Sequence, residues 1–140
     1  EAEFLCLPPC VSVSLVHKEE QVKGLSSLLA ASAIGFDVEC YAKNGEPTLL
    51  QLGSVDKIFL VDLLALGEDC ALADTLQEIW KAKMPKVGFG GAEDLCKVAR
   101  SFPVLGHFAE GSETVDLRHL EVERRLPLTC MDKKTRNAGR

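Results

Sequence analysis

The sequence predicts one α/β domain on a mixed β-sheet, in which three antiparallel strands precede parallel strands and helices cover the faces. Short apolar segments with a period of two alternate with longer segments of helical periodicity. Three consecutive strand-like segments are joined by turns too short to hold a helix, so these strands should be antiparallel, whereas the later strands alternate with helices and should be parallel. With 140 residues, of which 46% are hydrophobic, the chain suits one domain with a substantial core.

Changes of hydrophobic period predict the first three elements. Val11–Val16 alternates valine and serine before Leu-Val, which is typical of a strand. In His17–Ala31 the apolar residues recur at helical spacing, so we expect an amphipathic helix. Ser32–Cys40 opens with the apolar run Ala33–Phe36 and predicts a buried strand.

A hairpin and a further strand come next along the chain. The Asn44-Gly45 dipeptide favours a tight hairpin turn, because both residues tolerate positive φ angles. Thr48–Gly53 is then the returning strand of this hairpin, and Lys57–Leu63 is the third antiparallel strand.

The second half of the sequence alternates helices and strands. Asp69–Lys83 places its apolar residues on one helical face, and Lys86–Phe89 is a short strand that follows a proline. Glu93–Phe102 is a helix that ends before the next proline, and Thr114–Leu117 is the last strand. The predicted order is therefore β-α-β-β-β-α-β-α-β.

The charge and the apolar runs narrow the classes of function. The net charge is −5, which disfavours a protein that coats nucleic acid through many phosphate contacts. The same charge is compatible with a metal-dependent nuclease, whose site is acidic until cations fill it. No apolar run approaches the roughly 20 residues that a membrane-spanning helix needs, so we expect no membrane partner.

The cysteines indicate an intracellular protein of the cytoplasm or nucleus. The six cysteines have irregular spacing and no C-x-x-C pair, so we expect reduced thiols rather than disulfides. Cys40 and Cys96 lie in apolar segments and are expected in the core. The three histidines are scattered, which disfavours a zinc site.

The two ends are expected to lie outside the domain. Residues 1–10 are interpreted as a leader with an expression remnant at its start, and residues 11–120 as the domain. Residues 121–140 form a basic tail. Two interpretations of this tail remain open, namely a poorly ordered segment and a segment that contacts phosphates.

Asp37 and Glu39 are the first candidates for chemistry. Strand alternation places these two carboxylates on the same face, two residues apart. Neighbouring carboxylates repel each other, and divalent Mg²⁺ or Mn²⁺ removes that cost because these cations prefer carboxylate oxygen. The alternative is an ordinary pair that faces solvent at the end of a strand.

The second candidate segment is Lys86–Leu95, in which a strand leads through glycines into a helix with acidic residues in its first turn. Asp94 is the candidate ligand here. A favourable interaction of Glu93 or Asp94 with the helix dipole is the simpler alternative. The segment lacks the G-K-[ST] and G-x-G-x-x-G patterns of nucleotide-binding loops.

Together, these segments resemble the ribonuclease D-like 3′–5′ exonuclease domains, including the Werner-type branch. The resemblance runs without a large gap from about residue 11 to residue 120 and depends on the order and spacing of five segments. They are Phe36–Glu39, Pro47–Gly53, Lys57–Leu63, Lys86–Leu95 and Thr114–Leu117.

The resemblance implies an RNase H-like fold and a four-carboxylate active site that works with two divalent cations, Mg²⁺ or Mn²⁺. Asp37, Glu39 and Asp94 match three of the family's metal-binding, catalytic carboxylates. The partner that this implies is the 3′ end of single-stranded RNA or DNA. The residues expected to line the pocket for the terminal nucleotide are Leu49, Leu50, Gln51, Leu52 and Phe89.

The family's third motif, Tyr-x-x-x-Asp or His-x-x-x-x-Asp, does not occur in the 140 residues. Three explanations remain open at this point. The sequence is a piece of a longer exonuclease, or a catalytically impaired relative that binds nucleic acid or a protein, or its site is completed from elsewhere. In the last case a partner chain, Asp116 or Asp132 would supply the fourth carboxylate.

Overall fold

The structure, a computed structural model, describes residues 8–106, 108–109 and 111–118. These residues form six strands and six helical segments, of which η1 and η2 are 3₁₀ helices. In chain order they are β1 (Ser12–Val16), α1 (Glu19–Val22), η1 (Lys23–Ala30), β2 (Ile34–Cys40), β3 (Pro47–Gly53), β4 (Lys57–Asp62), α2 (Leu63–Leu66), α3 (Cys70–Lys81), β5 (Lys86–Gly88), α4 (Gly91–Ser101), η2 (Pro103–Leu105) and β6 (Thr114–Asp116).

All six strands belong to one mixed sheet in the order β1-β4-β3-β2-β5-β6. β2, β3 and β4 are antiparallel, while β5 pairs with β2 and β6 pairs with β5 in parallel. This confirms the predicted mixed sheet. β1 lies at the far edge, parallel to β4. The expected turn before β3 contains Gly45 at a φ of 69°, a conformation that favours glycine.

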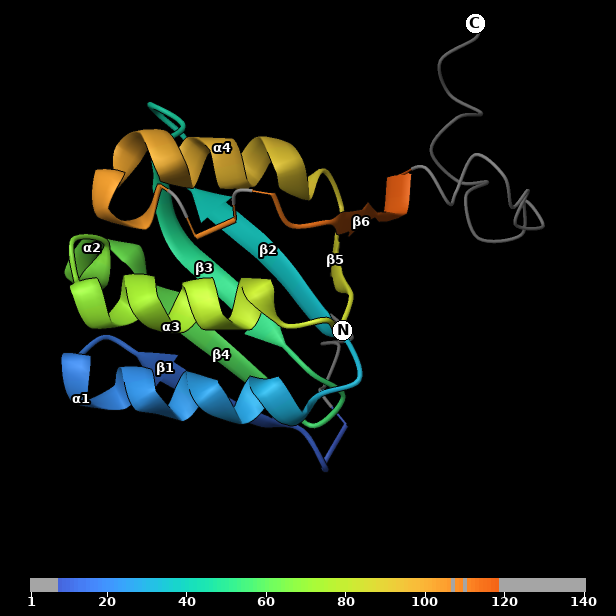
Figure 1. The fold of residues 1–140 in the computed structure, drawn as a ribbon. Helices are drawn as coiled ribbons and strands as arrows, with labels where there is room; N and C mark the ends of the chain where they lie inside the picture. Colours follow the sequence, from blue (N-terminus) through green and yellow to red (C-terminus); the bar gives the residue numbers. More distant parts are fainter. Residues whose placement is uncertain (1–7, 107, 110, 119–140) are drawn as a thin grey trace, which may run out of the picture.

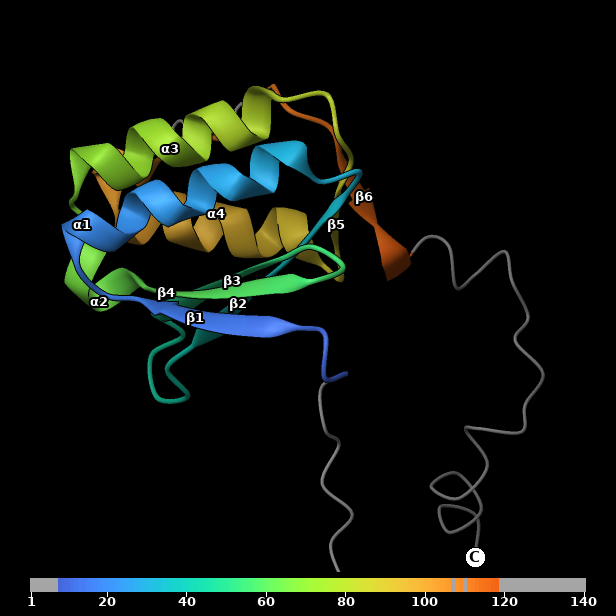
Figure 2. The same ribbon diagram turned by 90° about the horizontal axis from the view of Figure 1, so that it is seen from below.

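The helices η1, α3 and α4 lie together over one face of the sheet, whereas none of the described helices lies over the opposite face (Figures 1 and 2). Strand alternation sorts the side chains of β2 between these faces. Phe36 and Val38 are buried towards the helices, while Asp37 and Glu39 are exposed on the other side. We call the side without helices the open face.

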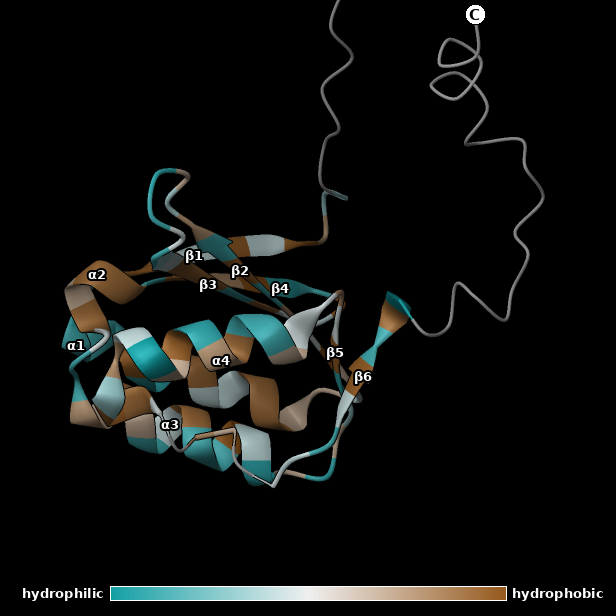
Figure 3. Cartoon of the chain, turned by 90° about the horizontal axis from the view of Figure 1, so that it is seen from above, coloured by the Kyte–Doolittle hydropathy of each residue, from teal (hydrophilic) through white to brown (hydrophobic). Residues whose placement is uncertain are grey.

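The core lies between the sheet and the helices. Edge-to-face aromatic contacts run through its centre, since the ring of Trp80 lies 5.6 Å from that of Phe36 and 4.8 Å from that of Phe108, measured between centroids. In Figure 3 hydrophobic stretches alternate with hydrophilic ones along the helices. Several fully buried leucines complete the core; they are Leu25, Leu28, Leu50, Leu52, Leu72 and Leu76.

Two predicted elements differ in detail from the structure. The expected helix His17–Ala31 is a short α-helix that continues as the 3₁₀ helix η1, which contains glycine and two serines with low helix propensity. The expected strand Lys57–Leu63 ends at Asp62, whose carboxylate accepts hydrogen bonds from the backbone N–H groups of Leu64 and Ala65 at 3.0 and 3.1 Å. This N-cap begins the short helix α2. This helix was not predicted from the sequence, because its residues are all apolar and show no helical period.

The expected burial of Cys96 is wrong. Cys96 is exposed on α4, because the buried stripe of this helix runs through Leu95 and Val98. Cys40 is half-buried and packs against the core. The expected tail lies outside the described residues, as does most of the expected leader. Within the described ranges, no helix has the length and apolar character to cross a bilayer.

Candidate metal and nucleic-acid site

The carboxylates of Asp37 and Glu39 lie on the open face at the centre of the sheet, as alternation predicts. Both side chains are exposed. β3 presents Gln51 directly opposite Asp37 in the antiparallel register, and its Nε2 donates to Glu39 Oε1 at 3.3 Å. The amide of Gln51 therefore orients one of the two carboxylates.

A groove of about 720 Å³ lies beside this pair. Its lining includes Asp37 and three of the predicted substrate contacts, Gln51, Leu52 and Phe89. The Phe89 side chain is 59% exposed, so its ring is available for stacking. Leu50 is fully buried in the core on the helix side and lines no part of this groove, because β3 alternation turns it away from Gln51.

Asp94 lies in the first turn of α4. Its carboxylate Oδ1 accepts a hydrogen bond from Lys97 Nζ at 2.9 Å, and its side chain is only 16% exposed. The bond to Asp94 is the main reason that the pKa of Lys97 is raised. The ammonium group of Lys97, which was not among the predicted site residues, therefore neutralises Asp94.

The three candidate ligands offer the hard oxygen donors that Mg²⁺ and Mn²⁺ prefer. Even so, the described part of the chain contains no group of three or more His, Cys, Asp or Glu side chains arranged to hold a metal ion. Two of the candidates have protein partners instead, because Glu39 binds Gln51 and Asp94 binds Lys97. Metal binding by all three carboxylates would require Asp94 to exchange Lys97 for a metal ion.

Asp116, an alternative fourth carboxylate, is engaged elsewhere. The guanidinium of Arg118 holds the pKa of Asp116 well below its ordinary value. Desolvation is the next largest effect and raises this pKa, while the backbone N–H groups of Arg118 and Gly90 lower it. In the parallel register Asp116 pairs with Gly88. It therefore lies on the helix side of the sheet, opposite the face of Asp37. Asp132 lies outside the described residues.

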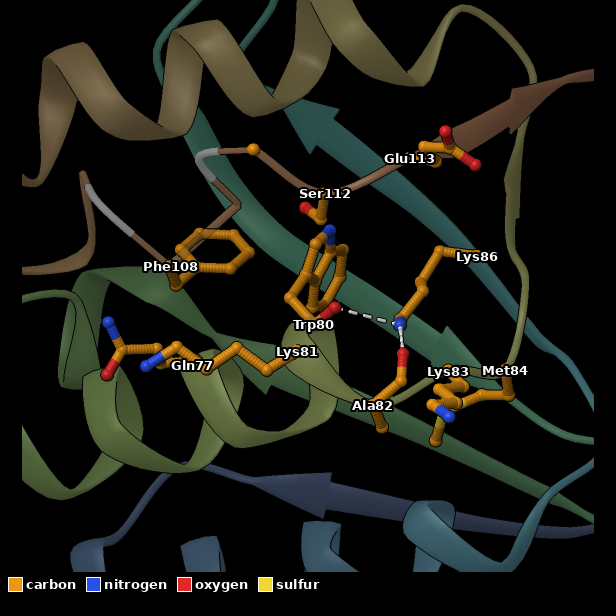
Figure 4. A pocket seen from close by; sticks show the side chains of 11 residues that line it. Gln77, Trp80, Lys81, Ala82, Lys83, Met84, Lys86, Phe108, Ser112 and Glu113 are labelled. Atoms are coloured by element: carbon orange, nitrogen blue, oxygen red, sulfur yellow. Dashed lines mark hydrogen bonds between the residues drawn. The ribbon is translucent and has the colours of Figure 1, made fainter.

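A second cavity, of about 560 Å³, lies on the helix side, where the end of α3 meets Lys86 and Phe108 (Figure 4). Lys86, only 2% exposed, donates from Nζ to the carbonyl oxygens of Trp80 and Ala82. These carbonyls belong to the end of α3, so the lysine caps that helix. Burial lowers the pKa of Lys86. Glu113 is the only carboxylate among the described lining residues.

No protein-family model matches the chain, and no curated protein matches it. Solved structures do. The chain is similar to the exonuclease domain of Nibbler from Aedes aegypti, with 22% identity and a TM-score of 0.67, over 89% of this chain and 62% of that one. It is similar to the EXD2 exonuclease domain, soaked in Mg and GMP, with 26% identity and a TM-score of 0.61 over 84% of this chain and 62% of that one.

A third similar structure is RNase D from Trypanosoma brucei, with 24% identity and a TM-score of 0.59. The match covers 75% of this chain and 37% of that one, and the same enzyme has also been solved in complex with RNA U12. The chain thus spans less than two thirds of the length of these relatives. Together with the sheet order and its strand directions, the matches establish the architecture. The chain has the RNase H-like fold of the ribonuclease D-type 3′–5′ exonuclease domains.

Proposed function

We propose that this chain carries a 3′–5′ exonuclease site, which hydrolyses phosphodiester bonds at the 3′ end of single-stranded RNA or DNA with two divalent cations, Mg²⁺ or Mn²⁺. The observation that supports it most is the position of Asp37. This carboxylate lines an open groove together with Gln51 and the exposed ring of Phe89, in a fold shared with exonuclease domains.

The residues of the groove have distinct roles in this proposal. Asp37, Glu39 and Asp94 hold the cations, while Gln51 keeps Glu39 oriented through its amide. Phe89 stacks on the terminal base, which is a contact that tolerates any base. Bound cations supply a Lewis acid and a more acidic water at the scissile phosphate. As part of this proposal, the cysteines are reduced and the protein is intracellular.

The second candidate is a catalytically impaired module that binds nucleic acid or a protein partner. The ion pair between Asp94 and Lys97 favours it, because the ammonium of Lys97 binds the oxygen that one expected metal ligand would offer. Both candidate functions use the same groove, but only the exonuclease hydrolyses the bound nucleic acid.

Degradation of 5′-labelled single-stranded RNA and DNA oligonucleotides with Mn²⁺ tests the proposal. The parent chain should shorten at least one of them from its 3′ end. Asp37→Ala should reduce the rate by at least about 100-fold, as expected for loss of a group that binds a catalytic metal. Asp74→Ala, at an exposed position on α3, is the matched control and should behave like the parent.

Binding without shortening would instead support the impaired module. Mn²⁺ should then still raise the melting temperature of the parent but not of Asp37→Ala. A parent chain that neither degrades nor responds to Mn²⁺ contradicts both the exonuclease and its metal site.

A further inference from the structure

The turn between β5 and α4 connects two parts of the proposed site. Phe89 of the groove precedes Gly90, and the candidate ligand Asp94 follows it by four residues. Gly90 is the N-cap of α4. Its φ of 75° is a conformation that residues with L side chains rarely adopt. A displacement of this turn would therefore move Phe89 and Asp94 together.

One side of the turn is set by close packing on Phe36, the neighbour of Asp37. A Cβ atom at Gly88 would lie 2.9 Å from the Phe36 ring, and one at Gly91 would lie 2.3 Å from it. The absence of side chains at both positions lets the turn approach the ring. Such packing prevents inward movement of the turn, and outward movement must be limited by other contacts.

Asp116, the last residue of β6, and Arg118, two residues beyond this strand, supply those contacts. Asp116 Oδ1 accepts hydrogen bonds from Gly90 N at 3.2 Å and from Arg118 N at 3.0 Å. The Arg118 guanidinium donates to Asp116 Oδ2 from Nε at 3.0 Å and from Nη2 at 2.8 Å. Its Nη1 reaches Glu93 Oε1, in the first turn of α4, at 3.5 Å.

This arrangement joins the edge strand to the start of the helix twice, once through the backbone of Gly90 and once through Glu93. Figure 1 shows the beginning of α4 next to β6. The Nε and Nη2 groups of Arg118 both donate to Asp116 Oδ2, and these charge-assisted bonds hold the carboxylate in the geometry that Gly90 N–H requires. Arg118 also lies over Gly90, since a Cβ there would be 3.4 Å from its Cζ.

We propose that Asp116 and Arg118 are a positioning pair that fixes the start of α4 against β2, and thereby sets Asp94 and Phe89 relative to Asp37. The inference rests on the proposed function. Neither residue is a catalytic residue, since both oxygens of Asp116 bind protein groups on the helix side of the sheet. The pair acts through the Gly90 turn.

Two measurements on the full chain test the pair. The first is hydrogen exchange of the backbone amides in residues 88–94 without metal, compared with those of α3. The second is the Mn²⁺ dissociation constant, from the free-Mn²⁺ signal in electron paramagnetic resonance. Asp116→Ala should speed exchange in residues 88–94 by about tenfold or more without affecting α3. It should also weaken Mn²⁺ binding by about 10- to 100-fold, the range for groups that orient ligands.

Conservative variants separate positioning from general stability. Asp116→Asn keeps an acceptor for Gly90 N–H and should retain most of the slow exchange, and Arg118→Lys should lie between Asp116→Ala and the parent. Asp74→Asn on α3 and Arg100→Lys on α4 are matched exposed controls and should match the parent. Unchanged exchange in residues 88–94 of Asp116→Ala overturns the proposal. If that variant does not fold, unchanged exchange in Arg118→Lys does so.

These measurements distinguish a failure of the proposed function from a failure of the positioning pair. A parent chain that binds no Mn²⁺ contradicts the metal site, and the exchange comparison then decides alone whether the pair fixes the turn. If the parent binds Mn²⁺ and Asp116→Ala binds it equally tightly despite faster exchange, the pair does not position Asp94 and the proposal fails.

Discussion

At the scale of single residues, Lys97 determines how readily Asp94 can take a metal ion. Lys97 Nζ lies 2.9 Å from Asp94 Oδ1, and a metal cation that binds this carboxylate must displace it. Lys97→Met should therefore tighten Mn²⁺ binding by about two- to fivefold at low salt, a modest effect because exposed ion pairs are weak. Calorimetric titration checks this, with Lys81→Met on α3 as the control. Equal dissociation constants for parent and Lys97→Met would show that the ion pair does not compete with metal.

Asp116 gives a second residue-scale prediction, on pH. Arg118 lowers its pKa in the folded chain below the ordinary value of about 3.9. The stability that this carboxylate contributes is thus present above that value and is lost as the pH falls through the lowered pKa. The difference in melting temperature between parent and Asp116→Asn should be full near pH 6, and it should begin to shrink only as the pH falls below about 3.9. A difference that stays constant or widens on acidification contradicts this account, whereas Asp74→Asn should parallel the parent throughout.

At the scale of elements, the packing of α4 on β2 depends on the missing side chain at Gly91. A Cβ there would lie 2.3 Å from Phe36 Cζ, in the core, so the helix or the ring must shift. We expect Gly91→Ala to lower the free energy of unfolding by about 1–3 kcal/mol, the usual range for overpacking. Urea unfolding measures it. Gly24→Ala in η1 is the matched control, since its Cβ would have 3.8 Å to the nearest atom and should be tolerated.

Local sequence patterns predicted the positions of the elements better than the burial of individual residues on them. β2 and α3 were predicted to within a few residues, because a period of two and a helical period are local properties of Ser32–Cys40 and Asp69–Lys83. The burial of Leu50 depends on which face of β3 packs inward, and the exposure of Cys96 depends on which face of α4 does. The period of the sequence alone leaves both choices open.

The partners of the candidate site were equally inaccessible to local reasoning. Gln51 reaches Glu39 across the β2–β3 register, and Asp116 reaches Gly90 from a strand 26 residues away. Lys97 is only three residues from Asp94, so helical spacing could have revealed this ion pair. The carboxylates thus followed from motifs, whereas most of the groups that orient them follow from tertiary contacts.

At the scale of the whole molecule, the core is one-sided. The buried leucines lie between the sheet and the helices, while β1 exposes Val13 and Leu15 on the opposite side, Leu15 to 53%. β1 is also an edge strand that pairs only with β4 in the described sheet. Stability should therefore depend on the helix side of each strand and be nearly insensitive to the open face.

Two leucine substitutions on different faces test this one-sidedness. Leu50→Ala, at 0% exposure, should lower the free energy of unfolding by about 2–5 kcal/mol because it leaves a cavity in the core. Leu15→Ala, which removes an exposed side chain, should change it by less than about 1 kcal/mol. Urea unfolding of the full chain at two protein concentrations measures both. If Leu15→Ala costs as much as Leu50→Ala, the open face is covered in solution, and a concentration-dependent midpoint would identify a second copy of the chain as the cover.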